Sequence, residues 1–131
     1  MIVVDASVLV NALADDDADG DLARSRLLAD PDLHAPSLVD LEVLSVLRRQ
    51  LRLGRLDNRR ADLAVADLRM LALTRYPHLE LVSRVWALRD TLTSYDGAYI
   101  ALAETLDCAL VTSDKRLARV SGSGRPVEVL G

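Results

Sequence analysis

The chain has 131 residues, half of them hydrophobic and 27% charged, which predicts one soluble domain over residues 1–131 and excludes two full hydrophobic cores. No apolar run is long enough to span a bilayer, and the N-terminus lacks the basic flank of a signal peptide, so we expect a cytoplasmic protein with no membrane segment. The single cysteine excludes an internal disulfide, and the formal net charge of −4 argues weakly against binding nucleic acid through bulk electrostatics alone.

Short apolar segments predict strands, and longer stretches with apolar residues at helical spacing predict helices between them. In chain order we expect a strand at Ile2–Val4, a helix to about Leu13, a helix at Leu22–Leu28, a brief strand at Leu33–Ala35, a long helix from Pro36-Ser37 to about Leu53, and a helix from Asn58 to about Leu73. There follow a strand at Leu79–Val82, helices at Val85–Leu92 and Tyr95–Leu106, a strand at Ala109–Val111, a short helix through Val120, and a terminal strand at Val127–Val129. Gly54 stands where the C-terminal cap of the long helix belongs.

The alternation of short apolar strands with helices predicts an α/β fold. Its central sheet should be short and mostly parallel, with helices covering both faces. In such sheets, ligands bind beyond the C-terminal ends of the strands. Asp5 and the segment Thr112–Asp114 both follow predicted strands, so this edge of the sheet is the first indication of a functional site.

Glu42 is the most informative single acid. Helical spacing places it beside Leu38, Val39, Ser45 and Val46, a largely apolar face. Because an uncompensated buried charge is very costly, Glu42 needs a partner. Either an arginine or a metal ion satisfies that need, and burial alone favours the arginine.

The other acids each have an ordinary structural explanation at a helix start. Asp5 and Asp114 follow strands, where an aspartate often serves only as an N-cap. Asp40 completes a capping box with Ser37, so we assign it no catalytic role, and a similar box accounts for Asp96. The set as a whole has no such explanation, because the predicted fold brings at least two of these acids to one edge of one sheet.

Arginine dominates the basic residues, and six of the fifteen arginines fall between Arg48 and Arg60. Arg48 and Arg52 are one helical turn apart, as are Arg55 and Arg59. Together they predict a basic patch that tracks phosphates. The competing interpretation is an ordinary solvated surface.

Four acidic segments follow one another along the chain. They are Val4-Asp5-Ala6-Ser7, Glu42 in a helix that begins after Pro36-Ser37, the stretch Ser94–Glu104 around Asp96, and Leu110–Asp114, in which a strand ends in Thr-x-Asp. Together they resemble the motifs of PIN-domain ribonucleases, in the right order and over nearly the whole chain. The Asp96 segment is the most specific of the four and closely resembles the third motif of VapC-type toxins.

The resemblance implies a ribonuclease whose catalytic and metal-binding acids are Asp5, Glu42, Asp96 and Asp114, with Ser7 and Thr112 orienting a carboxylate or a water. Clustered carboxylates repel by roughly 4 kcal/mol per pair at about 4 Å and an effective dielectric near 20, and divalent cations relieve that repulsion. Oxygen-only ligands select Mg²⁺ or Mn²⁺ over zinc. The metal would activate water and stabilise charge on the scissile phosphate.

The resemblance also implies a homodimer and a VapB-type antitoxin whose tail fills the cleft. The basic patch of Arg48, Arg52, Arg55 and Arg59 would then hold the RNA. Two alternatives stay open. One is another acidic-site α/β metal phosphohydrolase, although a haloacid-dehalogenase-like site needs a second aspartate where Ser7 stands, and a receiver-like site needs an acid pair beside the first strand. The other is a catalytically silent binding module, which a phosphodiesterase assay with and without EDTA distinguishes.

Overall fold

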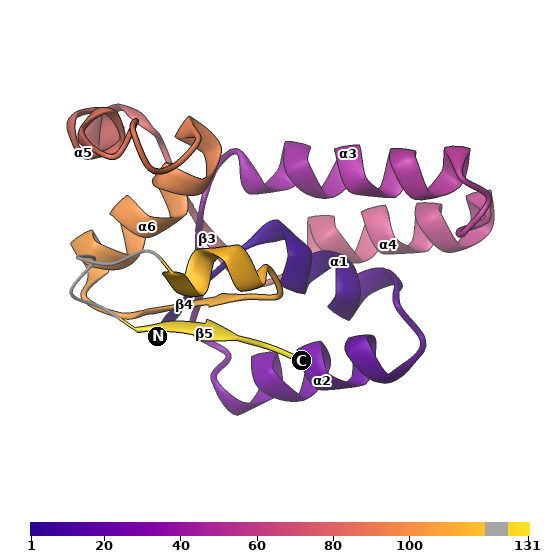
Figure 1. Cartoon of the computed structure of the whole chain (residues 1–131). Coiled ribbons are helices and arrows are strands. Elements are labelled where there is room, and N and C mark those ends of the chain that lie inside the picture. Colours follow the sequence, from indigo (N-terminus) through magenta and orange to yellow (C-terminus); the bar gives the residue numbers. More distant parts are fainter. Residues whose placement is uncertain (120–125) are drawn as a thin grey trace.

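The computed structural model describes residues 1–119 and 126–131, and its centre is a parallel sheet (Figure 1). The strands are β1 (Ile2–Val4), β2 (Leu33–Pro36), β3 (Leu73–Tyr76), β4 (Ala109–Thr112) and β5 (Val127–Val129). They lie in the order β3-β2-β1-β4-β5, and every neighbouring pair is parallel. The predicted parallel α/β fold is therefore confirmed.

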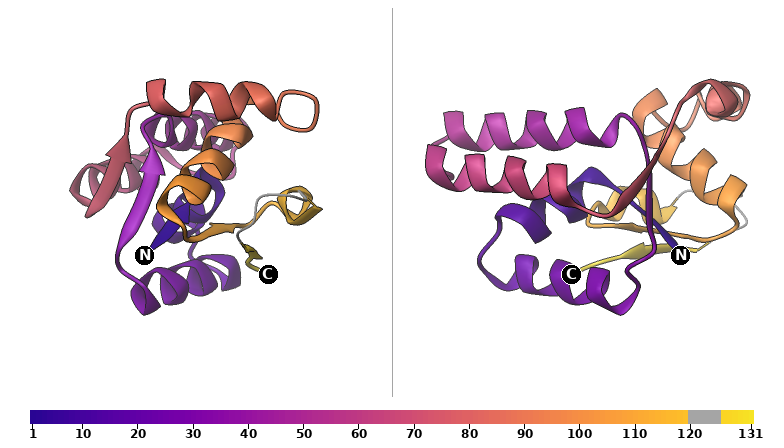
Figure 2. Two further views of the ribbon diagram at one scale, coloured as in Figure 1. Left: turned by 90° about the vertical axis from the view of Figure 1, so that its left-hand side faces the viewer. Right: turned by 180° about the vertical axis from the view of Figure 1, so that it is seen from behind.

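Helices connect the strands and cover the sheet. They are α1 (Ala6–Ala14), α2 (Ala18–Ala29), α3 (Val39–Arg52), α4 (Asn58–Met70), α5 (Val82–Ala87) and α6 (Ser94–Leu106), with the 3₁₀ turns η1 (Leu79–Leu81) and η2 (Lys115–Arg119). In Figures 1 and 2, α6 lies on one side of the sheet and α2 on the other. Within the described residues, no helix is long and apolar enough to cross a membrane.

The core is built around the central strand β1. Its three residues are at most 2% exposed, and they are all apolar because helices cover both faces of a parallel sheet. On α6, seven consecutive residues from Gly97 to Ala103 are buried. Gly97 permits a close approach of α5, since a Cβ there would lie 3.3 Å from Cγ1 of Val85.

Helices α3 and α4 run beside each other in opposite directions and, with α1, form one side of the molecule (Figures 1 and 2). Gly54 follows α3 with φ of +70°, the left-handed conformation expected of a glycine after a helix. Asp57 caps α4 by accepting a hydrogen bond from the backbone N–H of Arg60, at 2.7 Å.

Two sequence predictions in the middle of the chain are wrong. The strand predicted at Leu79–Val82 is the turn η1 and the start of α5, and the third strand is Leu73–Tyr76 instead. An apolar run of four residues does not distinguish a strand from a helical turn. The true strand is an edge strand that pairs only with β2, so its residues are partly exposed and show no continuous apolar run.

Other boundaries differ by a few residues. The second helix starts at Ala18 rather than Leu22, and the helix predicted to extend to about Leu73 ends at Met70. The helix predicted at Val85–Leu92 is shorter and earlier, at Val82–Ala87. Val120, where the last predicted helix ends, lies outside the described residues.

The capping box predicted for Asp40 and Ser37 is wrong. The N-cap of α3 is Leu38, which has no side-chain cap. Asp40 instead forms a two-point ion pair with Arg75 of β3, with nitrogen–oxygen distances of 2.7 and 2.9 Å. Asp40 thus links α3 to the sheet edge.

Candidate active site

Asp5 lies at the junction of β1 and α1 and is almost fully buried. One carboxylate oxygen caps α1 by accepting hydrogen bonds from Ser7 N at 3.1 Å and Val8 N at 3.3 Å, and it also accepts from Ser7 Oγ at 2.5 Å. The other oxygen accepts from Thr112 Oγ1 on the neighbouring strand β4. Burial raises the pKa of Asp5, and these hydrogen bonds oppose the rise.

The end of β4 is joined to the start of α1 by hydroxyl groups. Thr112 Oγ1 accepts from the backbone N–H of Asp114 at 2.9 Å, and Ser7 Oγ accepts from that of Ser113 at 3.0 Å. Because β1 and β4 are adjacent and parallel, their C-terminal ends meet at one edge. The structure therefore brings Asp5 and Asp114 together, as the sequence predicts.

Glu42 reaches the same edge from the first turn of α3. Its carboxylate accepts a hydrogen bond from the hydroxyl of Tyr99, at 2.5 Å. Within the described residues, no arginine pairs with Glu42, contrary to the alternative that burial favoured: the partner is a tyrosine, and Glu42 is only half-buried. Burial raises the pKa of Glu42, and the nearby charges of Asp96 and Asp5 raise it further.

Asp96 enters from the start of α6. Thr93 Oγ1 accepts a hydrogen bond from the backbone N–H of Asp96 at 3.2 Å, so the N-cap half of the predicted capping box is present. The carboxylate itself is half-buried, and this burial raises the pKa of Asp96. The charge of Arg116 lowers that pKa, while the charge of Asp114 raises it.

Asp114 forms an ion pair with Arg116, two residues further along the chain. The closest nitrogen and oxygen atoms are 2.6 Å apart. Hydrogen bonding to the guanidinium lowers the pKa of the Asp114 carboxyl. Asp114 is thus charged over a wider pH range than the other three acids, whose pKa values are raised.

All four predicted acids line one cavity of about 570 Å³. Ser7 and Tyr99 also line it, with apolar walls from Leu41 and Val46. We call Asp5, Glu42, Asp96 and Asp114 the cavity acids. The sequence analysis missed two residues that bind them, Tyr99 and Arg116. Their spacing in the sequence could have indicated them: Tyr99 lies three residues after Asp96, and Arg116 lies two residues after Asp114.

The chemistry of this donor set fits a hard divalent cation, since the cavity acids supply only oxygen and raise one another's pKa. Among the described residues, however, no three acidic, histidine or cysteine side chains converge closely enough to enclose one ion. Tyr99, Thr112 and Arg116 instead occupy carboxylate oxygens. A cation would therefore compete with these hydrogen bonds, above all with the Arg116 ion pair.

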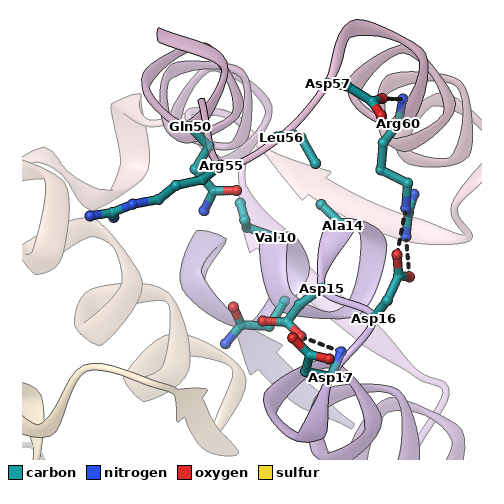
Figure 3. A pocket seen from close by; sticks show the side chains of 11 residues that line it. Val10, Ala14, Asp15, Asp16, Asp17, Gln50, Arg55, Leu56, Asp57 and Arg60 are labelled. Atoms are coloured by element: carbon teal, nitrogen blue, oxygen red, sulfur yellow. Dashed lines mark hydrogen bonds and ion pairs between the residues drawn. The ribbon is translucent and has the colours of Figure 1, made fainter. Parts of the chain in front are cut away.

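The predicted RNA-binding arginines lie outside this cavity and have exposed side chains. Arg48 and Arg52 are on α3, Arg55 is in the connection to α4, and Arg59 is on α4. Arg55 lines a second cavity of about 420 Å³ beside the acidic loop after α1. In Figure 3 its side chain points away from those acids, whereas the neighbouring Arg60 is paired with Asp16, at 3.0 Å.

Comparison with known proteins decides the family. A model of the PIN domain matches residues 2–123. The chain belongs to the PIN-domain family. This PIN domain is 47% identical to ribonuclease VapC9 of Mycobacterium tuberculosis, over 99% of this chain and 98% of that protein. It is 40% identical to ribonuclease VapC3 of the same species, over 96% of this chain and 91% of that protein.

Solved structures agree with this assignment. The PIN domain is similar to PAE2754 from Pyrobaculum aerophilum, with a TM-score of 0.69 and 28% identity over 96% of this chain and 83% of that chain. It also shares its fold with VapC20 of Mycobacterium tuberculosis, a toxin that cleaves the sarcin–ricin loop. The TM-score is 0.65, with 20% identity over 84% of this chain and 87% of that chain. The chain thus stands among the VapC ribonucleases, which excludes the haloacid-dehalogenase-like and receiver-like alternatives.

Proposed function

We propose that this PIN domain is the toxin of a toxin–antitoxin pair, a metal-dependent endoribonuclease that hydrolyses RNA phosphodiester bonds at the cavity acids. The observation that carries the proposal is that four carboxylates from distant segments line one cavity. Its relatives VapC9 and VapC3 bear the name ribonuclease, and that name agrees with this chemistry.

In this proposal the cavity acids hold Mg²⁺ or Mn²⁺. When bound, the ion supplies an activated water and stabilises charge on the scissile phosphate. The role of the protein is to hold the carboxylates in place. Ser7 donates to one oxygen of Asp5 and Thr112 to the other, and Tyr99 donates to Glu42, so hydroxyl groups orient these two acids.

The proposed partners follow from the family. They are an RNA substrate, a VapB-type antitoxin and a second copy of the chain, all in the cytoplasm. Arg48, Arg52, Arg55 and Arg59 are proposed to contact the RNA backbone, and their exposure in the structure is compatible with this role. An acidic protein with a net charge of −4 then binds RNA because cations neutralise the cavity acids and arginines elsewhere hold phosphates.

Cleavage of RNA by the purified protein tests the proposal. We expect cleavage with Mg²⁺ or Mn²⁺, none in excess EDTA, and recovery when the metal is restored, because the donor set contains only hard oxygen ligands. Protein carrying Asp96→Asn, purified in the same way, controls for contaminating nucleases. Full activity in EDTA would exclude the metal mechanism, and absence of cleavage under every condition would favour the silent binding module.

A further inference from the structure

We infer that Arg116 is a substrate-binding residue. When a divalent cation displaces Arg116 from Asp114, the freed guanidinium binds a phosphate oxygen of the RNA. The inference rests on the proposed function and adds a residue to the proposed site. It concerns the charge balance of the cavity acids before and after a cation binds.

Arg116 lies on η2, and its guanidinium contacts both oxygens of the Asp114 carboxylate. Nε lies 3.1 Å from Oδ1 and 3.2 Å from Oδ2, and Nη2 lies 2.6 Å from Oδ2. The backbone N–H of Arg116 also donates to Oδ1, at 2.9 Å. The Arg116 side chain is 82% exposed while that of Asp114 is 27% exposed, so the guanidinium lies on the solvent side of the acid.

The positive charge of Arg116 acts on two of the cavity acids. Beyond its direct pairing with Asp114, it favours the charged form of Asp96 and partly offsets the rise that burial causes in the pKa of that carboxyl. In the part of the chain that the structure describes, no other ion pair reaches a cavity acid. Among the described residues, Arg116 therefore supplies the positive charge that is paired directly with a cavity acid in the metal-free protein.

This ion pair is suited to exchange. Exposed ion pairs contribute little to stability and are screened by salt, so Asp114 loses little when its partner changes. A divalent cation carries twice the charge of a guanidinium and prefers carboxylate oxygen. Once Asp114 has become a ligand, the donors of Arg116 are left unpaired beside the cavity, facing solvent.

The released guanidinium matches the anionic group of the proposed substrate. A planar guanidinium donates two parallel hydrogen bonds to a phosphate, which a lysine ammonium does not reproduce. The two-residue separation from Asp114 keeps Arg116 next to the proposed reaction centre. A phosphate that approaches the cavity acids would thus meet Arg116 on their exposed side.

The test compares the wild-type protein with Arg116→Ala, Arg116→Lys and Arg119→Ala. Arg119 is an exposed arginine on the same turn, so its substitution removes the same charge without touching Asp114. Each RNA-free protein is titrated with Mn²⁺ by calorimetry. Each is then assayed in saturating Mg²⁺ for steady-state cleavage of a single-stranded RNA oligonucleotide that the wild type cuts.

For Arg116→Ala we expect Mn²⁺ binding as tight as in the wild type or several-fold tighter, because a competitor for Asp114 is gone. We expect kcat/KM to fall about tenfold, mainly through a higher KM. A tenfold change corresponds to the loss of roughly one charge-assisted hydrogen bond. Arg116→Lys should recover part of this loss. Arg119→Ala should match the wild type in both measurements.

Three results would overturn the inference while leaving the proposed function in place. Unchanged kcat and KM in Arg116→Ala would make Arg116 only a counterion of Asp114. Weaker Mn²⁺ binding by Arg116→Ala would mean that Arg116 positions Asp114 for the cation. An equal loss of kcat/KM in Arg119→Ala would reveal a general electrostatic effect. A wild-type protein that binds Mn²⁺ yet cuts no RNA would contradict the proposed function itself, and the Arg116 assignment with it.

Discussion

Asp96 lies both at a helix start and at the wall of the cavity, so its carboxylate has two possible roles. The helix start is already capped by Thr93, whose hydroxyl accepts from the backbone N–H of Asp96. That hydrogen bond uses the backbone of Asp96 and does not require its carboxylate. The raised pKa of Asp96 shows that burial disfavours its charged form in the metal-free protein.

We predict that Asp96→Asn abolishes cleavage while leaving metal-free stability unchanged or raised. The substitution removes a proposed metal ligand, and it also removes a charge that burial and Asp114 disfavour. Urea unfolding in EDTA and an RNA cleavage assay measure both quantities on one sample. A variant that is clearly destabilised and still cuts RNA would make the Asp96 carboxylate a helix-terminus residue only.

Thr93→Ala is the matched control for this substitution. It removes the N-cap hydrogen bond but keeps the carboxylate of Asp96. Loss of such a cap typically costs about 1 kcal/mol. The control should therefore lose stability and keep its cleavage activity, the reverse of the pattern expected for Asp96→Asn.

At the scale of the element, α3 connects the cavity to the arginine-rich end of the helix pair. Glu42 is in its first turn and Arg52 is its last residue, about 15 Å apart along the axis at 1.5 Å per residue. Arg59 is on α4, beyond the connection that contains Gly54. In the proposed complex, an RNA strand with one phosphate at the cavity would continue along α3 towards both arginines.

We predict that replacing Arg52 and Arg59 together with alanine weakens RNA binding and flattens its salt dependence. The slope of log K against log salt is negative, and each lost phosphate contact reduces its magnitude by about 0.7 for a single strand. Binding titrations at several salt concentrations give this slope. The control replaces Arg69 and Arg89, which are also exposed, and changes net charge by the same amount. Equal slopes for both double variants would assign Arg52 and Arg59 to an ordinary solvated surface.

At the scale of the whole molecule, the cavity acids make stability depend on pH and metal together. Asp5, Glu42 and Asp96 have raised pKa values in the folded state. Each folded carboxyl therefore holds its proton more tightly than the unfolded chain does. Their contribution to metal-free stability is greatest below the unfolded pKa and falls as pH rises through the raised folded pKa. Asp114, whose pKa is lowered, opposes this trend and loses its stabilising charge only as pH falls.

We predict that Mg²⁺ stabilises the fold, and more strongly at about pH 7.5 than at about pH 5, where the protons of these carboxyls compete with it. At a concentration about 100 times the dissociation constant, the gain is about 2.7 kcal/mol. Unfolding in urea with Mg²⁺ or EDTA at both pH values measures this difference. Asp96→Asn should show a smaller gain, and equal stability with and without Mg²⁺ in the wild type would contradict a metal site built from the cavity acids.

The sequence was sufficient for the parallel α/β fold and for the meeting of Asp5 and Asp114, and its resemblance to PIN domains added Glu42 and Asp96. Buried strands such as Ile2–Val4 are continuous apolar runs, and residues that follow adjacent parallel strands must meet at one edge. The edge strand Leu73–Tyr76 could not be predicted in this way, because it is partly exposed and lacks such a run. The apolar run at Leu79–Leu81 was the more strand-like pattern, yet it forms a helical turn.

What the sequence by itself determined is the order of elements and the edge at which Asp5 and Asp114 meet, because both depend on local pattern and chain topology; Glu42 and Asp96 were expected there from the resemblance to PIN domains. Only the tertiary structure decided the partners of Glu42 and Asp40. Tyr99 binds Glu42 across 57 residues, and Arg75 binds Asp40 across 35. Such pairs depend on how helices pack and on which side chain reaches across the gap, and residue spacing along one helix carries no information about a neighbour that is distant in sequence.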